Sequence, residues 1–310
     1  MNSKKIGSLE LLLLAAIIWG VAFVAQSVGM NYVGPFTFNT VRSLIGGIVL
    51  LPIVYIMRKR TPRVQPDASK RGGKRTLLLG GVLCGVCLCL GSNLQQIAIQ
   101  YTVVGKVSFI TALYIILVPV LGIFLRRRVG ITVWISIIIA VVGMYFLCIT
   151  EGFSVNIGDV LTLIGSLCFA THILVIDYFT RRTDGVAMSC IQFFTCGLIT
   201  AVPMFLFESP SGTAILNAWQ PICYAGILSC GVAYTLQIIG QKNVDPTLSS
   251  LVLSLESVIG ALAGWVLLGQ ELSLREIFGC ILVFCGIILA QLPTDILSKK
   301  RLKTGGSKNE

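Results

Sequence analysis

The chain has 310 residues, of which 55% are hydrophobic and only 12% are charged, and its formal net charge is +11. A soluble domain carries about 25% charged residues, so the composition excludes an ordinary soluble enzyme, and the apolar content excludes a disordered chain. We therefore predict an all-α membrane protein, because a spanning β-barrel would need alternating strands of about 10 residues instead of long apolar runs.

Ten apolar stretches are each long enough for the about 20 residues that a helical span requires. The first has no clear signal-peptidase site, so we expect it to stay in the protein as a span. In chain order the expected transmembrane helices are residues 9–29, 37–57, 76–99, 103–125, 130–149, 157–179, 186–207, 218–241, 247–268 and 272–291.

The basic residues predict the orientation of these spans. With the N-terminus in the cytoplasm, 21 of the 24 Lys and Arg residues fall on the cytoplasmic side, Lys106 and Arg275 fall outside, and Arg42 lies within a span. This is the bias of the positive-inside rule, and it places both termini in the cytoplasm, with residues 293–310 as a basic cytoplasmic tail. Because the basic residues form short runs between apolar stretches, we expect no binding of nucleic acid.

The second half of the chain repeats the pattern of the first half. Trp19 matches Phe169 at an offset of 150 residues, and Gln96 matches Gln237 at an offset of 141 residues. Each half holds five expected spans, an odd number, so the second copy enters the membrane from the opposite side. Two inverted five-helix repeats are the plan of many secondary transporters, which expose a central site to each side in turn.

Several short motifs carry a resemblance to a known family. They are Trp19-Gly20 in the first span, Phe109-Ile110-Thr111 in the fourth, and a closing block of Glu256, Gly264-Trp265 and Gly286. With these motifs the chain resembles an EamA-type transporter of the drug/metabolite transporter superfamily. The resemblance implies one EamA repeat over residues 8–149 and another over residues 157–292. It also implies export or exchange of small metabolites, such as amino acids and related compounds, by alternating access.

Glu256, Arg42 and His172 lie inside expected spans and away from the span ends, where a charge costs about 2.5–3.5 kcal/mol on insertion scales. Glu256 lies near mid-depth and is either a proton-coupling or cation-binding carboxyl or a structural one. Arg42 either binds an anionic group of the substrate, pairs with Glu256, or extends to the outer interface. His172 is either a proton relay or a neutral packing residue. Nearer the membrane surfaces, Lys106 either extends to the outer interface or draws anionic substrates, and Asp177 pairs with Arg181 and Arg182.

Aromatic and uncharged polar side chains complete the candidate site. Trp19 and Tyr114 are expected at mid-depth, where they can wall a central cavity, and amide side chains such as Gln237 either line it or join helices. The candidate substrate-binding residues are Trp19, Asn39, Arg42, Asn93, Tyr114, His172, Gln192, Tyr234 and Glu256.

The sequence predicts no enzyme, no cofactor and no metal site. The chain has one histidine, which excludes an H-E-x-x-H zinc site, and its 11 cysteines lie almost entirely within apolar stretches, where they serve as small packing residues. We expect a multi-pass efflux transporter of the cell membrane. Its substrate is a small molecule, and protons are the candidate coupling ion. A channel or a lipid scramblase is the first alternative and an intramembrane enzyme is the next. The sequence leaves the substrate, the direction and the oligomeric state open.

Overall fold

The computed structural model describes residues 3–60, 73–102, 104–127, 129–148, 156–268 and 273–291. The basic segment 61–72, Arg128, Glu271 and the predicted basic tail 293–310 lie outside the described residues. All regular secondary structure within the described residues is helical.

The helices follow the expected spans closely. The first half contains α1 (Ser3–Gly29), α2 (Pro35–Arg60), α3 (Lys74–Ala98), α4 (Val104–Ala112), α5 (Tyr114–Phe124) and α6 (Ile131–Cys148). The second half contains α7 (Ile157–Thr180), α8 (Gly185–Phe207), α9 (Gly212–Asn217), α10 (Trp219–Cys223), the π-helix η1 (Tyr224–Ala233), α11 (Tyr234–Gln241), α12 (Pro246–Leu253), α13 (Leu255–Leu268) and α14 (Leu274–Gln291).

Eight helical stretches of the described chain are long and apolar enough to cross a membrane by length and composition. The other two expected spans are α6 and α14, which have 18 residues each. The total of ten spans and the cytoplasmic location of both termini stay predictions.

Two of the spans are interrupted at related positions. The fourth breaks at Leu113, between α4 and α5, and the ninth breaks at Ser254, between α12 and α13. Around each break the backbone forms bonds of the tighter i−3 type, from Ile116 N to the Leu113 carbonyl (2.9 Å) and from Ser257 N to the Ser254 carbonyl (3.2 Å). Leu113 and Ser254 are 141 residues apart, the offset that matches Gln96 with Gln237.

The two halves pack in an inverted manner. Gln96 donates to the carbonyl of Gln26 (3.3 Å), so α1 and α3 end on the same side of the bundle. Gly158, at the start of α7, lies against Ala98 and Tyr101 at the end of α3, so α7 runs opposite to both. The helix contacts follow the exchange of halves as well: α3 packs on α7 and α8, while η1 and α11 pack on α1, and η1 packs on α2.

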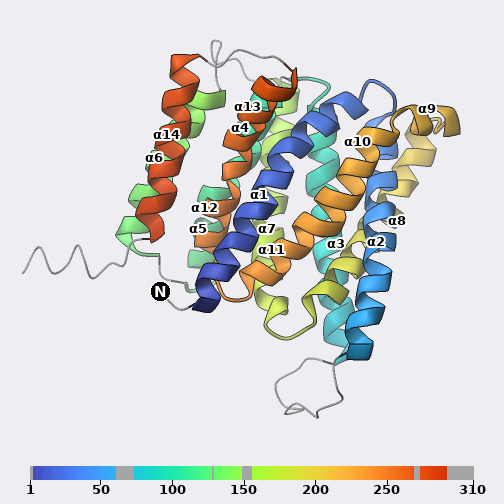
Figure 1. The fold of residues 1–310 in the computed structure, drawn as a ribbon, viewed down its shortest axis with the longest axis horizontal. Helices are drawn as coiled ribbons and strands as arrows, with labels where there is room; N and C mark the ends of the chain where they lie inside the picture. Colours follow the sequence, from blue (N-terminus) through green and yellow to red (C-terminus); the bar gives the residue numbers. More distant parts are fainter. Residues whose placement is uncertain are drawn as a thin grey trace, which may run out of the picture.

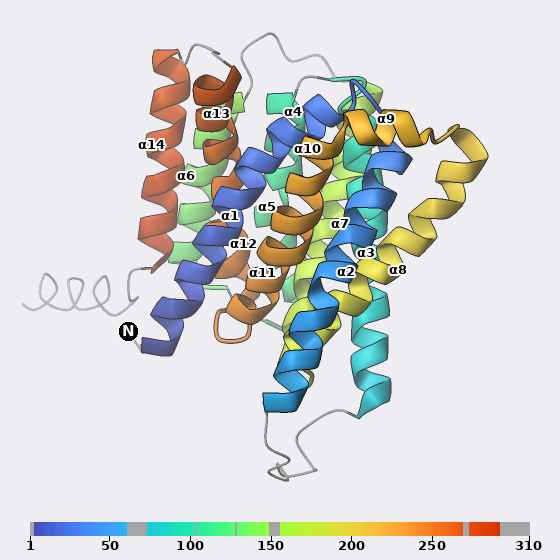
Figure 2. The same cartoon turned by 45° about the vertical axis from the view of Figure 1, so that its right-hand side comes forward.

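The α6 and α14 helices stand together at one edge of the bundle (Figures 1 and 2). Glycines permit their close contact: Gly143 of α6 lies against Gly279 and Leu282, and Gly286 of α14 lies against Ser136. The remaining helices surround a core to which both halves contribute. The candidate site lies within this part of the bundle.

Candidate functional site

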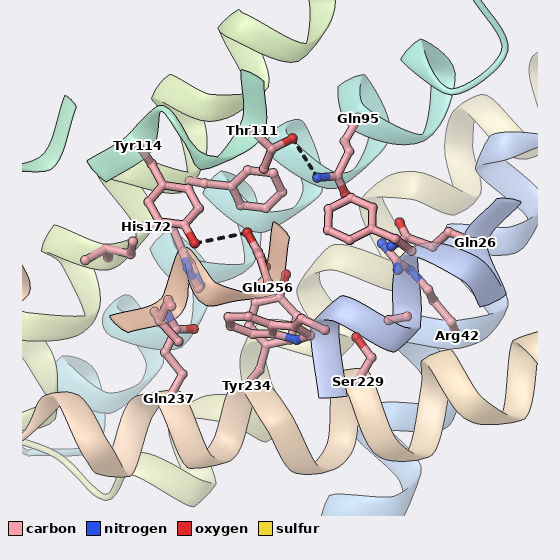
Figure 3. A pocket seen from close by; sticks show the side chains of 16 residues that line it. Gln26, Arg42, Gln95, Thr111, Tyr114, His172, Ser229, Tyr234, Gln237 and Glu256 are labelled. Carbon is pink, nitrogen blue, oxygen red and sulfur yellow. Dashed lines mark hydrogen bonds between the residues drawn. The ribbon is translucent and has the colours of Figure 1, made fainter. Parts of the chain in front are cut away.

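A cavity of about 50 Å³ lies between the two halves. A cavity needs about 10–15 Å³ to hold one water molecule, so this space has room for a few of them. Its wall combines apolar residues with ten polar or aromatic polar side chains, which Figure 3 labels: Gln26, Arg42, Gln95, Thr111, Tyr114, His172, Ser229, Tyr234, Gln237 and Glu256.

The two helix breaks place their chemical groups opposite each other. Tyr114 is the first residue of α5 after the break at Leu113, and Glu256 follows the break at Ser254 by two residues. The Tyr114 hydroxyl donates to Glu256 Oε1 at 3.0 Å (Figure 3), and both side chains are buried. A carboxyl group and its hydrogen-bond donor thus join the two halves across the cavity.

Aromatic rings form the wall next to this pair. Trp19 of α1 and Tyr234 of α11 have ring centroids 4.5 Å apart, and Phe193 lies 5.5 Å from Tyr234 in an edge-on arrangement. The indole Nε1 of Trp19 is buried and has no hydrogen-bond partner in the described residues. The wall therefore offers an apolar surface together with an available donor.

His172 also lines the cavity, and its ring lies 5.9 Å from that of Tyr234. Its Nε2 lies 3.0 Å from Oε1 of Gln192. Gln192 is fully buried behind the histidine and is not among the residues of the cavity wall. Gln192 can therefore orient the imidazole without itself reaching a molecule in the cavity.

Arg42 lines the cavity from α2 and is only 6% exposed. Its guanidinium lies 5.6 Å from the ring centroid of Phe38, and it forms no ion pair with any described residue. The pairing of Arg42 with Glu256 that the sequence allowed is not present, because Glu256 is bonded to Tyr114.

Asn39 and Asn93 lie outside the cavity wall, in a polar network between helices. Asn39 donates to Asn93 Oδ1 at 2.8 Å, and Asn93 donates to Thr200 Oγ1 at 2.8 Å. This network connects α2, α3 and α8. Six of the nine candidate residues thus meet at the cavity, and Asn39, Asn93 and Gln192 support the helices around it.

Sequence reasoning did not single out Gln26, Gln95, Thr111 or Ser229 for this site. Gln95 donates to Thr111 Oγ1 at 2.9 Å, and this bond connects α3 with α4 at the cavity (Figure 3). The repeat provided a weak signal, because Gln95 precedes Gln96, which matches Gln237 in the second half. The sequence does not give the orientation of this helix about its own axis, however, so it does not tell which of the two adjacent glutamines faces inward.

Two charged candidates have protein partners outside the cavity. Lys106 Nζ lies 2.6 Å from Asp159 Oδ2 at the start of α7, and Lys106 is not among the residues of the cavity wall. Asp177 pairs with Arg181 at 3.0 Å, as expected, and with Arg127 at 2.5 Å, which was not expected. Arg182 lies instead over the ring of Tyr178, 3.9 Å from its centroid.

The described residues contain no group of three or more His, Cys, Asp or Glu side chains that could hold a metal ion. The polar groups of the cavity are a carboxyl, a guanidinium, an imidazole, hydroxyls and amides. Such a set can bind a small polar molecule by hydrogen bonds and charge, and its carboxyl and imidazole can exchange protons.

The chain is similar to several proteins that are named as transporters. It is 27% identical to an uncharacterized transporter of Archaeoglobus fulgidus over 287 residues, which cover 91% of this chain and 84% of that protein. It is 23% identical to the uncharacterized transporter YoaV of Bacillus subtilis, with 88% and 92% of the two chains covered. It is 25% identical to the uncharacterized inner membrane transporter YedA of Escherichia coli strain K12, with 89% and 88% covered.

The fold is also that of a solved crystal structure, with a TM-score of 0.76 and 17% sequence identity over 94% of this chain and 98% of the other. The model of the EamA-like transporter family matches this chain twice, over residues 8–149 and over residues 156–292. The two matches cover nearly all of the chain and correspond to its two halves, so the chain belongs to the EamA-like transporter family.

Proposed function

We propose that the protein is a secondary transporter that moves a small metabolite, amino-acid-like or related, across the cell membrane by alternating access. The observation that carries this proposal is the central cavity, whose wall comes from both inverted halves. When the halves rock against each other, a site between them opens to one side and then to the other. The protein acts as an exporter or exchanger.

The Tyr114–Glu256 pair supports protons as the coupling ion. The Glu256 carboxyl is buried at the break of one span and accepts a hydrogen bond from the break of the related span. Protonation of this carboxyl would weaken the bond, because a neutral carboxyl is a poorer acceptor than a carboxylate. A proton taken up on one side would thus change the contact between the two halves.

The test is uptake of a panel of radiolabelled metabolites into proteoliposomes, with and without a pH gradient. A carrier should show saturable uptake and counterflow, whereas flux that rises linearly with concentration would identify a channel. The panel contains the twenty L-amino acids, and nucleosides serve as compounds that lack a carboxylate.

Glu256→Gln tests the coupling role, since it keeps the size of the side chain but cannot take up the proton. We expect the stimulation of uptake by a pH gradient to fall about 10-fold or more in this variant, while counterflow with the same pH on both sides of the membrane persists. Glu276→Gln is the matched control, because Glu276 lies at the exposed start of α14, where it bonds Ser273. Unchanged pH stimulation in Glu256→Gln would contradict the coupling role.

A further inference from the structure

Arg42 is a buried cation that forms no ion pair within the described part of the chain. It is 94% buried, and its Nε has no hydrogen-bond partner. The guanidinium stays charged at all physiological pH values. A buried charge inside a membrane needs an ion pair, hydrogen bonds or water to offset its loss of hydration, and among the described residues no carboxylate pairs with it.

The carboxyl that could neutralise Arg42 is held elsewhere in the same cavity. Glu256 is the one acidic residue of the cavity wall, and its Oε1 accepts the Tyr114 hydroxyl. Figure 3 shows Arg42 beside Gln26 at one end of the cavity and the Tyr114–Glu256 pair toward the other end. The cavity thus has a cationic end for which the described residues supply no acidic partner.

A second unsatisfied donor points to the same kind of ligand. Trp19 and Arg42 both belong to the cavity wall, and their Nε1 and Nε atoms are buried without an acceptor among the described residues. An oxyanion is the group that satisfies such donors and also the charge of Arg42. Arg42 is the one arginine or lysine side chain in the wall, and this favours a singly charged carboxylate over a phosphate dianion.

We propose that Arg42 is the specificity-determining residue that binds the carboxylate of the transported molecule. The planar guanidinium can hold a carboxylate through two parallel hydrogen bonds, whereas the rings of Trp19 and Tyr234 contact the organic part. The inference rests on the proposed transport function, because it names the substrate class of that same cavity: small carboxylates.

The experiment extends the uptake screen in proteoliposomes. Each L-amino acid that the wild-type protein carries is tested again as its carboxamide, which keeps the shape but lacks the negative charge. We expect the carboxamides to compete for uptake about 10- to 100-fold more weakly than the carboxylates, the range for a hydrogen bond to a charged group.

Substitution of Arg42 separates binding from folding. Arg42→Gln should raise the KM of carboxylates about 10- to 100-fold with little change in kcat, and should bring carboxylate and carboxamide to similar affinity. Arg42→Lys should bind carboxylates more tightly than Arg42→Gln but less tightly than the wild type, since lysine keeps the charge but cannot form two parallel hydrogen bonds. Arg275→Gln is the matched control, because its guanidinium lies over the rings of Tyr145 and Phe146, away from the cavity wall.

Thermal unfolding in detergent separates a binding role of Arg42 from a structural role, because only a structural role predicts a lower melting temperature for Arg42→Gln. Loss of an unpaired buried charge should leave the melting temperature of Arg42→Gln equal to that of the wild type or raise it. A clear drop, with unchanged selectivity between carboxylates and carboxamides, would overturn the inference. Transport of nucleosides alone, unaffected by Arg42→Gln, would overturn it while leaving the transport function in place, and absence of all saturable transport would instead contradict the proposed function.

Discussion

The α4–α5 span and the α12–α13 span occupy related positions in the two halves, yet they are held in different ways. The first is fixed by polar contacts from α7: Lys106 pairs with Asp159, and Ser166 donates to the carbonyl of Thr111 at 2.9 Å. Beyond the end of α5, Arg127 pairs with Asp177 of the same helix. The first broken span is therefore bound to α7 near both ends and next to its break.

Most of the polar contacts of the second broken span lie within the span itself. Asp245 caps the start of α12 by accepting from Thr247 N at 2.9 Å. Near the break, Ser254 donates to the Leu251 carbonyl at 2.7 Å, and Ser257 donates to the Ser254 carbonyl at 2.8 Å. This span is held to the other half by close packing on α1, by the bond from Tyr114 to Glu256, and by a long, exposed ion pair between Asp245 and Arg127 (4.0 Å).

This difference indicates that the first broken span is the more firmly fixed of the two. Directional polar bonds resist sliding, whereas a packed interface of small residues allows small rigid shifts. The α12–α13 span, which carries Glu256, is thus the better candidate to move when the carboxyl changes its protonation. Three sets of substitutions test the comparison.

The largest effect is expected at Gly20, where α1 meets α13. A Cβ at this position would lie 2.5 Å from Ile259 Cβ and 2.8 Å from the backbone nitrogen of Gly260. Gly20→Ala should therefore lower the free energy of unfolding in mixed micelles by about 2–3 kcal/mol, as overpacking does, and should slow transport. Gly7→Ala, on the same helix with open space around it, should be neutral or stabilising. Equal behaviour of the two variants would show that α13 does not depend on this contact.

The next effect concerns the buried ion pair at the start of the first broken span. The side chains of Lys106 and Asp159 are 12% and 7% exposed. In Lys106→Met, the Asp159 carboxylate keeps the hydrogen bond from the backbone N–H of Asn156 but loses its cation. We therefore expect the free energy of unfolding to fall by about 2 kcal/mol in the same measurement. Asp245→Ala removes the cap of the second broken span and the long, exposed ion pair with Arg127, which contributes little, so it should cost about 1 kcal/mol. If Asp245→Ala cost more unfolding free energy than Lys106→Met, the two spans would not differ in how they are anchored. Lys242→Met is the control, because Lys242 is exposed.

The sequence alone predicted much of this architecture but not the contacts between spans. Hydropathy and charge are properties of each segment, so they located the helices, and the offset of Gln96 to Gln237 revealed the two halves. The breaks were not expected at Leu113 and Ser254, because no proline or glycine occupies either position. Lys106 and Asp159 lie 53 residues apart, and their pairing depends on how α4 packs against α7, which no local pattern encodes.

The smallest effect distinguishes the two breaks themselves. Ser166 is fully buried and donates from α7 to the Thr111 carbonyl, so Ser166→Ala removes a bond between helices and should cost about 1 kcal/mol, within the range for interhelical hydrogen bonds in membranes. Ser254→Ala removes only a bond within its own span, and because such local bonds compete with helical bonding of the backbone, the cost should be a few tenths, about 0.3 kcal/mol. The difference is measured as unfolding of both variants against the wild type in the same micelles. If Ser254→Ala costs as much as Ser166→Ala, the second break depends on its own serines to keep its shape, and the α12–α13 span would then be as rigidly specified as its counterpart.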